Sequence, residues 1–348
     1  MTTMQLMLSN IDDYLGPAET RFFSRGYQRA RYDVGDVTVD RGRRAVAARA
    51  NVAYPADWSR KQEQTDLRPH LSTIDALVLG VQCAEVELIH AHLLDRDRRR
   101  SSRLRKVTLR AGTAPQEELQ DITISATWLD SRPQRSGDGW RQVSRHECRV
   151  GSLRVRTEIE HPAGEPAGDT GHVRHDSLEA ALGSPGSRFY GAGFQRRRHV
   201  IEDVEVDVDK LTTQATARFV GEPDPGCAEG LDGGTHPSIS LVDCFVVNLQ
   251  LAQVLMYELD GIRRSESNTL WMMQTVLERA AGTAPLGDPS ISLPVETAII
   301  SKKPVSLRGA TWRTADLRGE LGGVSLRSSF AHELPERAAQ AAGAPIST

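Results

Sequence analysis

Residues 21–50 read RFFSRGYQRARYDVGDVTVDRGRRAVAARA, and residues 188–217 read RFYGAGFQRRRHVIEDVEVDVDKLTTQATA. The two stretches align without a gap at an offset of 167 positions, and identities recur along the whole run. The matching pairs include Arg21/Arg188, Phe22/Phe189, Gly26/Gly193, Gln28/Gln195, Arg29/Arg196, Arg31/Arg198, Asp36/Asp203, Val37/Val204, Val39/Val206 and Asp40/Asp207. Self-similarity at a fixed spacing is the signature of repeated structural units. This stretch therefore predicts two copies of one module.

The similarity continues outward from this stretch with small shifts of register. HLSTIDALVLGVQCAEVEL (70–88) parallels SISLVDCFVVNLQLAQVLM (238–256), and the pentapeptide AGTAP occurs at 111–115 and again at 281–285. Further on, Trp140 and Arg141 correspond to Trp312 and Arg313. The sequence thus predicts an internal duplication, with a first copy at 11–160 and a second at 188–333.

Each copy shows the same order of expected elements: two strands, one long helix and further strands. Apolar residues alternate at Val34, Val37 and Val39, which is typical of a strand, whereas 74–94 is apolar almost all round and is expected to be a buried helix. This order predicts an α+β fold, a tandem double hot dog in which each half wraps an antiparallel sheet around one long apolar helix. The expected helices are 73–94 and 239–259, and the later strands are 106–110, 121–129, 153–159, 271–276, 290–300 and 323–330.

Two segments outside the copies have the composition of irregular chain. Residues 161–187 (HPAGEPAGDTGHVRHDSLEAALGSPGS) are rich in glycine, proline and aspartate, which predicts a flexible linker. The tail 334–348 is rich in alanine, proline and serine, and we expect it to be disordered.

Composition narrows the class of protein. The chain has 348 residues, 39% of them apolar and 26% charged, with a net charge of −3. It lacks the basic excess of a nucleic-acid-binding protein. Residues 1–10 lack the basic start and apolar core of a secretory signal, and polar residues interrupt the longest apolar run, 241–256, so no membrane span is expected.

Four cysteines are present, and none of them has a spacing typical of a metal site. Cys83 and Cys244 fall within the apolar helical patterns, where a reduced core thiol is expected. These features favour a cytoplasmic protein that needs neither a metal nor a cofactor.

Polar residues recur at matched positions of the two apolar helices. Asp75, Gln82 and Glu85 are spaced to share one face of the first helix, and Asp243, Gln250 and Gln253 repeat the pattern in the second. An aspartate in the first turn has two interpretations. It either caps its own helix, where negative charge is favoured, or acts as a general base or acid with a pKa raised by its apolar surroundings. The glutamines and Glu85 are candidates for substrate binding.

Two histidines and two repeated arginines complete the candidate site. His70 and His236 precede the two helices, at different distances from the aspartates, and each is either structural or a partner in proton transfer. The repeated GYQR (26–29) and GFQR (193–196) end in Arg29 and Arg196. These arginines either lie at the surface of a turn or bind an anion, because guanidinium matches carboxylate and phosphate well.

Several segments resemble the avirulence-D (AvrD) family. The resemblance covers nearly the full chain and is carried by IDDYLGPAETRFFSRGYQRARY (11–32), YPADWS (54–59), LRPHLSTIDALVLGVQ (67–82) and HPSISLVDCF (236–245). It implies a role in making syringolides, which are acyl-sugar elicitors, by joining a β-ketoacyl thioester to a pentulose. More weakly, the twin hot-dog plan is similar to that of the A-factor synthase family, which implies esterification of a β-ketoacyl carrier protein with a ketose phosphate.

The leading hypothesis is therefore an acyltransferase-type condensing enzyme of secondary metabolism. It would act on an acyl thioester of CoA or acyl carrier protein and a small ketose, with Asp75 or Asp243 as base and His70 or His236 moving the proton. Amides at a helix N-terminus would bind the oxyanion. Two alternatives remain open: a hot-dog dehydratase or thioesterase, since HPSISLVDCF is also similar to a polyketide dehydratase motif, and a non-catalytic protein that binds an acyl ligand. A homo-oligomer is also possible on this reading.

Overall fold

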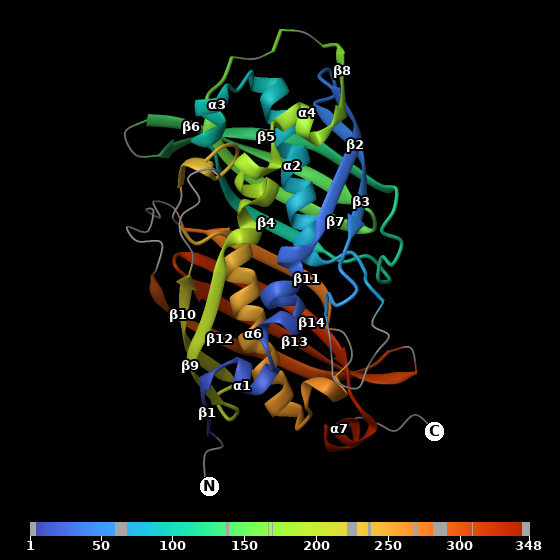
Figure 1. Ribbon diagram of the computed structural model, residues 1–348, viewed down its shortest axis with the longest axis vertical. Helices are drawn as coiled ribbons and strands as arrows, with labels where there is room; N and C mark the ends of the chain where they lie inside the picture. Colours follow the sequence, from blue (N-terminus) through green and yellow to red (C-terminus); the bar gives the residue numbers. More distant parts are fainter. Residues whose placement is uncertain are drawn as a thin grey trace.

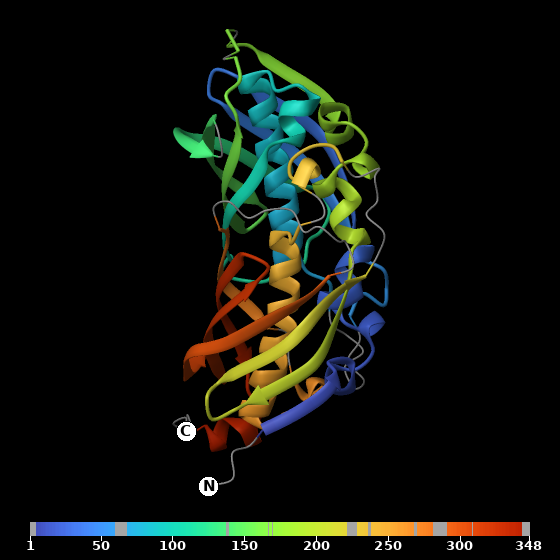
Figure 2. The ribbon, with the colours of Figure 1, turned by 90° about the vertical axis from the view of Figure 1, so that its left-hand side faces the viewer.

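The structure is a computed structural model that describes residues 5–59, 68–136, 139–165, 167–168, 170–220, 228–235, 238–267, 270–280, 291–307 and 309–342. Its strands form one antiparallel sheet in the order β1-β9-β10-β12-β13-β14-β11-β4-β7-β6-β5-β3-β2-β8. The sheet curves around two long helices, which follow one another along the long axis of the molecule (Figures 1 and 2). The α+β hot-dog class expected from the sequence is confirmed at this level, with one long buried helix in each half of the sheet.

The elements of the first half recur in the same order in the second. The first half contains β1 (Gln5–Asn10), α1 (Asp12–Leu15), β2 (Arg31–Asp40), β3 (Ala45–Ala53), α2 (Thr73–His92), α3 (Arg96–Arg100), β4 (Arg103–Arg110), β5 (Ile122–Ser136), β6 (Gly139–Val150) and β7 (Leu153–Pro162). The second contains β8 (His172–Ser177), α4 (Leu178–Leu182), α5 (Phe194–Arg196), β9 (Arg198–Asp207), β10 (Thr212–Val220), α6 (Leu241–Asp260), β11 (Trp271–Arg279), β12 (Ser292–Leu307), β13 (Ala310–Leu321) and β14 (Val324–Glu333). The strand order reads as a palindrome about the β4–β11 pair, so the halves are related by an approximate two-fold axis.

The edges of the sheet correct the predicted linker. β1 begins at residue 5 and pairs with β9 of the second half, and β8, which lies 167 positions later, pairs with β2 of the first half. Each half therefore sends its first strand to the edge of the other half. Residues 172–187 belong to this repeated arrangement and are not only a linker, and α7 (Glu336–Ala341) shows that the tail also contains a helix.

Both long helices are buried on nearly all sides, as their continuous apolar character requires. α2 and α6 start at Ser72 and Ser240, each of which forms a reciprocal capping box with an aspartate three residues later. α6 is long and apolar enough to cross a membrane by length and composition, but 89% of its most apolar window is buried inside the protein. It is therefore the core helix of its half.

Each long helix contacts the sheet through one glycine and one larger residue. The glycine lies on the helix in the first half and on the strand in the second. In the first half Gly80 of α2 faces Cys148 of β6, whose thiol lies 3.4 Å from the Gly80 carbonyl oxygen. At the matching place in the second half, Asn248 of α6 faces Gly319 of β13, where an added Cβ would lie 2.0 Å from Asn248 Oδ1. A glycine faces a larger residue at both contacts, so each helix can pack closely on its sheet.

The repeated GYQR and GFQR segments meet at the approximate two-fold axis. Tyr27 and Phe194 stack with their ring centroids 6.4 Å apart. Gln28 donates to the carbonyl oxygen of Arg197 at 2.6 Å, and Gln195 donates to that of Ala30, the residue that matches Arg197, at 2.7 Å. These reciprocal bonds join the halves as in a symmetric dimer interface, which gives both glutamines a structural role.

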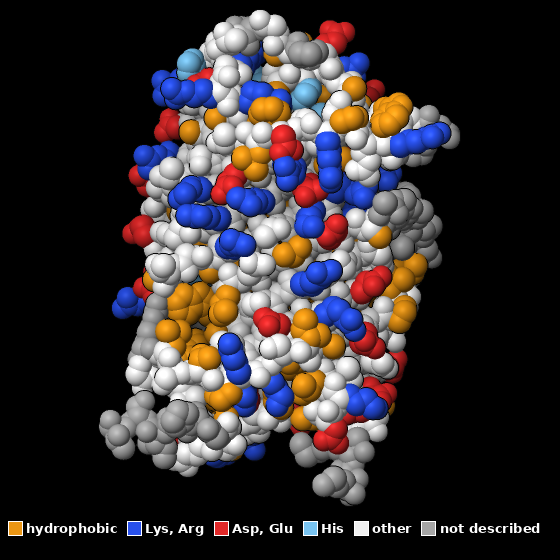
Figure 3. Space-filling view, turned by 180° about the vertical axis from the view of Figure 1, so that it is seen from behind, with side chains coloured by type: hydrophobic (Ala, Val, Ile, Leu, Met, Phe, Trp, Pro, Cys, Tyr) orange, Lys and Arg blue, Asp and Glu red, His pale blue; other side chains and the backbone are white. Residues whose placement is uncertain are grey.

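The outer face of the sheet is covered with charged side chains of both signs (Figure 3). Arg156 pairs with Glu147 at 2.8 Å, and Lys106 pairs with Glu278 of the other half at 2.8 Å. Because the basic groups are interleaved with acids, this face has the character of a solvated surface rather than a nucleic-acid-binding patch.

Candidate functional site

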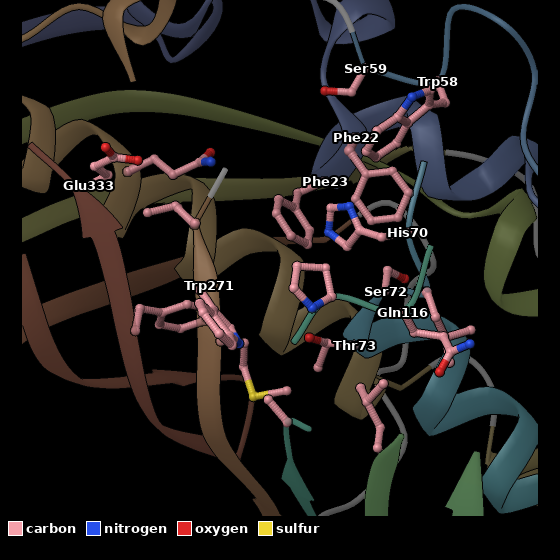
Figure 4. Close-up of a pocket in the computed structure, with 18 of the residues that line it drawn as sticks. Phe22, Phe23, Trp58, Ser59, His70, Ser72, Thr73, Gln116, Trp271 and Glu333 are labelled. Atoms are coloured by element: carbon pink, nitrogen blue, oxygen red, sulfur yellow. The ribbon is translucent and has the colours of Figure 1, made fainter. Parts of the chain in front are cut away.

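A cavity of about 330 Å³ lies where the start of α2 meets the second half. Its walls are largely aromatic and apolar, and they come from both halves of the chain (Figure 4). The first half contributes Phe22, Phe23, Trp58, Leu71, Ala111, Pro115 and Leu153, and the second contributes Tyr257, Leu270, Trp271, Met272, Trp312 and Phe330. A concave, mainly apolar space with a few polar groups is the usual form of a small-molecule site.

The start of α2 provides one polar wall of this cavity. His70, Ser72 and Thr73 line it, and the His70 ring lies edge-on to Trp58 with the ring centres 5.8 Å apart. Figure 4 shows the imidazole between the rings of Phe22 and Phe23 and the side chain of Thr73. The cap of α2 engages the amide of Asp75, and the Ser72 carbonyl accepts from Ala76. The amides of Thr73 and Ile74 take part in neither bond.

Arg21, Gln253 and Arg264 also line the cavity, as does Gln116. Arg21 is only 4% exposed, and its Nη2 donates to Asp12. Arg264 donates from Nη2 to the Thr20 carbonyl oxygen at 3.1 Å. Burial lowers the pKa of Arg21 to about 10, with Asp12 opposing and Arg264 adding to this shift. Two guanidinium groups therefore lie close together beside the cavity.

Asp75, one of the two predicted bases, is completely buried and lies outside the cavity lining. Its carboxylate accepts from the Ser72 amide at 2.7 Å, from the Tyr32 hydroxyl at 2.7 Å and from the Tyr54 hydroxyl. Burial raises the pKa of Asp75, while the hydrogen bonds from Ser72, Tyr54 and Tyr32 act in the opposite direction. Since its acceptor positions are filled by the protein itself, the capping interpretation fits Asp75 better than the interpretation as a base.

Asp243 occupies the matching position at the start of α6 and is also enclosed. It accepts from the Ser240 amide at 2.9 Å and from Arg197 at 3.1 Å, and it is 3% exposed. Arg197 in turn lies over the Phe219 ring, 4.6 Å from its centre. Asp243 is thus held in a capping box and a buried ion pair, and no wall of the described cavity includes it.

At the place that matches the cavity, near the start of α6, described side chains contact one another. Here the carboxylate of Glu85 accepts from the Leu231 amide at 3.1 Å and pairs with Arg99 at 3.2 Å. Arg188, the counterpart of Arg21, donates to Gln82 at 3.0 Å. Gln82 and Glu85, which the sequence suggested for substrate binding, are therefore used in internal contacts.

The remaining predicted binding residues divide between the cavity and other places. Gln253 lines the cavity. Gln250 lies one turn away, contacting the Phe23 carbonyl oxygen at 3.1 Å and His199 Nε2 at 2.9 Å. Arg29 donates to Asp57 at 2.8 Å, and Arg196 is exposed, with neither arginine in the cavity lining. His236 falls outside the described residues.

Sequence reasoning found His70 and Gln253 but missed most of the cavity wall. Arg21 and Phe22 were among the repeated identities, yet repetition alone did not distinguish a structural residue from a binding one. Trp58 lies in the quoted YPADWS segment. Trp312 was also among the repeated identities. Trp271 and Arg264 carry no local signal, because they reach the site only through the pairing of the two halves.

Other titratable groups gather at the far end of α2. His90 and His175 of β8 approach with their Nε2 atoms 3.0 Å apart, and His146 contacts Glu87 at 2.8 Å. Burial, followed by the charge of His175, lowers the pKa of His90 to about 4. Within the described ranges, no group of three or more His, Cys, Asp or Glu side chains is arranged to hold a metal ion.

Comparison with solved structures finds distant likenesses. A conserved hypothetical protein of Mycobacterium tuberculosis with a double hotdog fold is 12% identical, with a TM-score of 0.40 over 77% of this chain and 83% of that chain. The tesB protein of Mycobacterium avium subsp. paratuberculosis is 9% identical, with a TM-score of 0.35 over 84% and 93%. The dehydratase domain of PpsC from M. tuberculosis, solved with C12:1-CoA, is 11% identical, with a TM-score of 0.32 over 86% and 97%.

Comparison of sequences assigns the chain to a family. None of the curated proteins compared with this chain matches it. The family model described as Pseudomonas avirulence D protein (AvrD) matches residues 6–335, which is nearly the whole chain and includes both halves. The resemblance noted in the sequence is thereby confirmed, and this protein belongs to the AvrD family.

Proposed function

We propose that this protein is a biosynthetic acyltransferase that condenses a β-ketoacyl thioester with a hydroxyl group of a small ketose. The observation that carries the proposal is the aromatic cavity between the halves, which brings His70 and the start of α2 to one apolar space. Membership of the AvrD family supports a biosynthetic role, and the geometry supports the chemistry described below.

The apolar walls suit the acyl chain of the thioester. Phe22, Phe23, Trp271 and Trp312 line a space of about 330 Å³, which is at the small end of the range for ligand sites. Each methylene that enters such a space contributes about 0.8 kcal/mol of binding free energy. We therefore expect a chain of moderate length, with the polar thioester placed at the polar wall.

The start of α2 suits the thioester carbonyl. When an alcohol attacks the thioester, negative charge develops on this oxygen, and fixed amide donors stabilise it more than they stabilise the ground state. The amides of Thr73 and Ile74, at the positive end of a twenty-residue buried helix, are the donors that we assign to it. Ser72 and Asp75 keep these amides in place through the capping box.

His70 is the group that we assign to proton transfer, in place of the two aspartates. Its imidazole can take the proton of the attacking ketose hydroxyl. The oxygen then bonds to the acyl carbon, the carbon–sulfur bond breaks, and His70 returns the proton to the departing thiolate. The products are an ester of the ketose and a free thiol, so no oxidant, metal or cofactor is required.

We also propose that the two halves are copies of one hot-dog module, of which only the first retains the open site. The matched order of elements and the reciprocal Gln28 and Gln195 bonds support common descent. Filling of the second site by Glu85, Arg99 and Leu231 supports a single site per chain.

The test is a search for the condensed product by mass spectrometry. The purified protein is incubated with β-ketoacyl thioesters of CoA or acyl carrier protein and with small ketoses, and ester formation is followed together with thiol release. Ester that depends on the protein supports the proposal. Thiol release with only free acid as product would indicate a thioesterase, loss of water from a hydroxyacyl thioester would indicate a dehydratase, and binding without turnover would indicate a ligand-binding protein.

A further inference from the structure

Arg21 is a buried cation whose hydrogen-bonding capacity is only partly used. Nη2 donates to Asp12, but Nε and Nη1 are inaccessible to solvent and have no acceptor among the described residues. The side chain is 5% exposed and forms part of the cavity wall. A buried donor without an acceptor is costly, and a charged one more so, so the unused nitrogens beside a cavity indicate that a ligand supplies the acceptor.

The matching arginine of the second half shows what satisfies these two nitrogens. In Arg188, Nε donates to the Gly183 carbonyl oxygen at 3.1 Å, and Nη1 donates to Gln82 Oε1 at 3.0 Å. The corresponding glutamine of the other helix, Gln250, instead contacts the Phe23 carbonyl oxygen and His199. The same two atoms are thus filled by the protein at the closed site and left open at the site with the cavity.

A second guanidinium strengthens the case for an anionic ligand. Arg264 also lines the cavity, and burial lowers its pKa. Its charge and that of Arg21 act on each other, since Arg264 contributes to lowering the pKa of Arg21. An anion bound between them would relieve this repulsion and supply hydrogen-bond acceptors.

We propose that Arg21 and Arg264 form a phosphate-binding subsite in the wall of the cavity, which deepens the proposed function by giving the substrates a phosphate group. Phosphate fits better than carboxylate for two reasons. Its three terminal oxygens can meet donors that point in different directions, and its charge at neutral pH is between −1.5 and −2. A carboxylate has two oxygens in one plane and a single charge.

The phosphate has two chemical sources that the experiment separates. It belongs either to the ketose or to the pantetheine arm that carries the acyl group. Matched ligand pairs differ only in this group: a pentulose with its 5-phosphate, and pantetheine with 4′-phosphopantetheine. Calorimetric titration of the full chain with each ligand measures the phosphate preference without any need for turnover.

We expect the wild-type protein to bind the phosphorylated member of one pair about ten- to a hundredfold more tightly, the range expected for charge-assisted hydrogen bonds. Arg21→Met should abolish most of this preference, measured as the ratio of the affinities for the two members of the pair. Arg264→Met should reduce it. Arg196→Met removes an exposed arginine outside the cavity lining and serves as the charge-matched control, which should keep the full preference.

Preference within either pair, lost on removal of Arg21, supports the subsite and identifies its source. Equal binding of both members of both pairs by the wild-type protein would overturn it, even if Arg21→Met failed to fold. A preference that survives in folded Arg21→Met, or disappears equally in Arg196→Met, would also overturn it. Because binding is measured without turnover, a phosphate preference in a protein that forms no ester refutes the condensation and leaves the subsite standing.

Discussion

The starts of α2 and α6 are built from matching residues, but their surroundings differ. A cavity lies beside the start of α2, whereas a loop occupies the matching place beside α6. Both helices have a serine cap with a buried aspartate, and an arginine precedes each π-helical turn, Phe22–Gly26 and Phe189–Gly193. At the closed site the loop at 228–235 enters the space and its Leu231 amide reaches Glu85. At the open site the residue that matches Glu85 is Gln253, which lines a cavity.

If the two halves are copies of one module, as we propose, this difference shows how such a module can specialise. Glu85 carries a charge that needs internal partners, and Arg99 and the Leu231 amide provide them. Gln253 is neutral, so its side chain can face a cavity at little cost. Both halves have the same kind of cap, which stabilises each helix, whereas the surroundings of the two arginines differ.

The largest expected difference between the open and the closed site is in the rate of ester formation, and it should appear when His70 is replaced. His70→Ala removes the proposed proton carrier, and the rate of ester formation should fall about 10²–10⁴-fold. The melting temperature should stay nearly unchanged, because the ring is only partly buried and packs mainly on Trp58. Single-turnover assays followed by mass spectrometry measure the rate. Asp243→Asn, at the closed site, is the control and should keep the rate per folded molecule; if it instead abolished ester formation and His70→Ala did not, the site assignment would be wrong.

The next largest expected effect is on the free energy of unfolding, and it concerns the two glycines at the helix–sheet contacts, Gly319 and Gly80. Gly319→Ala places a Cβ 2.0 Å from Asn248 Oδ1, and overpacking of this kind should lower the free energy of unfolding by about 1–3 kcal/mol. Gly80→Ala should cost less, since its nearest neighbour, the Val155 Cβ, lies 3.3 Å away. Urea unfolding compares the two variants.

A double variant sharpens that result. Asn248→Gly gives α6 a glycine at the position that matches Gly80 of α2. It also removes the side chain that the methyl group of Gly319→Ala would contact. It should therefore recover part of the loss caused by Gly319→Ala, giving a non-additive pair. Additive losses, or a greater cost for Gly80→Ala than for Gly319→Ala, would show that the halves do not pack in the exchanged manner described.

The smallest expected effect is a difference in pH dependence between two buried aspartates. Burial raises the pKa of Asp75, so its folded form binds the proton more tightly; its stabilising contribution is present below the unfolded value of about 3.9 and is lost as pH rises through the raised pKa. For Asp260, burial acts upward but His332 and Arg313 outweigh it and lower the pKa. Its contribution is present above the unfolded value and is lost as pH falls through the lowered pKa.

Chemical denaturation of the wild type, Asp75→Asn and Asp260→Asn across the acidic range measures these contributions. Asp75→Asn should remove a decrease of stability with rising pH, and Asp260→Asn should remove an increase. Identical pH profiles for the two variants would mean that both aspartates have the same environment, which contradicts the hydrogen bonds described for them.

The sequence was most informative where the signal is local or repeated. The continuous apolar character of 74–94 predicted α2, and the offset of 167 matched the start of β2 to that of β9 within the described chain. β6 and β13 were missed because their inward positions include polar residues: His146 and Ser144 in β6 and Arg313 in β13 are all buried. Hydrogen bonds to Glu87, His161 and Asp260 make this burial possible, and such partners lie too far along the chain to be recognised from a pattern.

The candidate site was less predictable than the fold. Asp75 was singled out because a carboxylate in an apolar helix looks reactive, but Tyr32 of β2 and Tyr54, just after β3, both donate to it. The exchange of β1 and β8 between the halves was hidden in a segment with the composition of a linker. The cavity depends on contacts between halves, so its second-half residues other than Gln253 could be identified only from the structure.

The most direct test of the account is a crystal structure of the protein with a non-hydrolysable β-ketoacyl thioester analogue. The account predicts that the acyl chain lies among Phe22, Phe23 and Trp271, with the carbonyl oxygen within hydrogen-bonding distance of the Thr73 or Ile74 amide and His70 beside it. An analogue bound at the start of α6, against Arg188 and Glu85, or bound with its carbonyl away from α2, would contradict the assignment of the open cavity as the site of condensation.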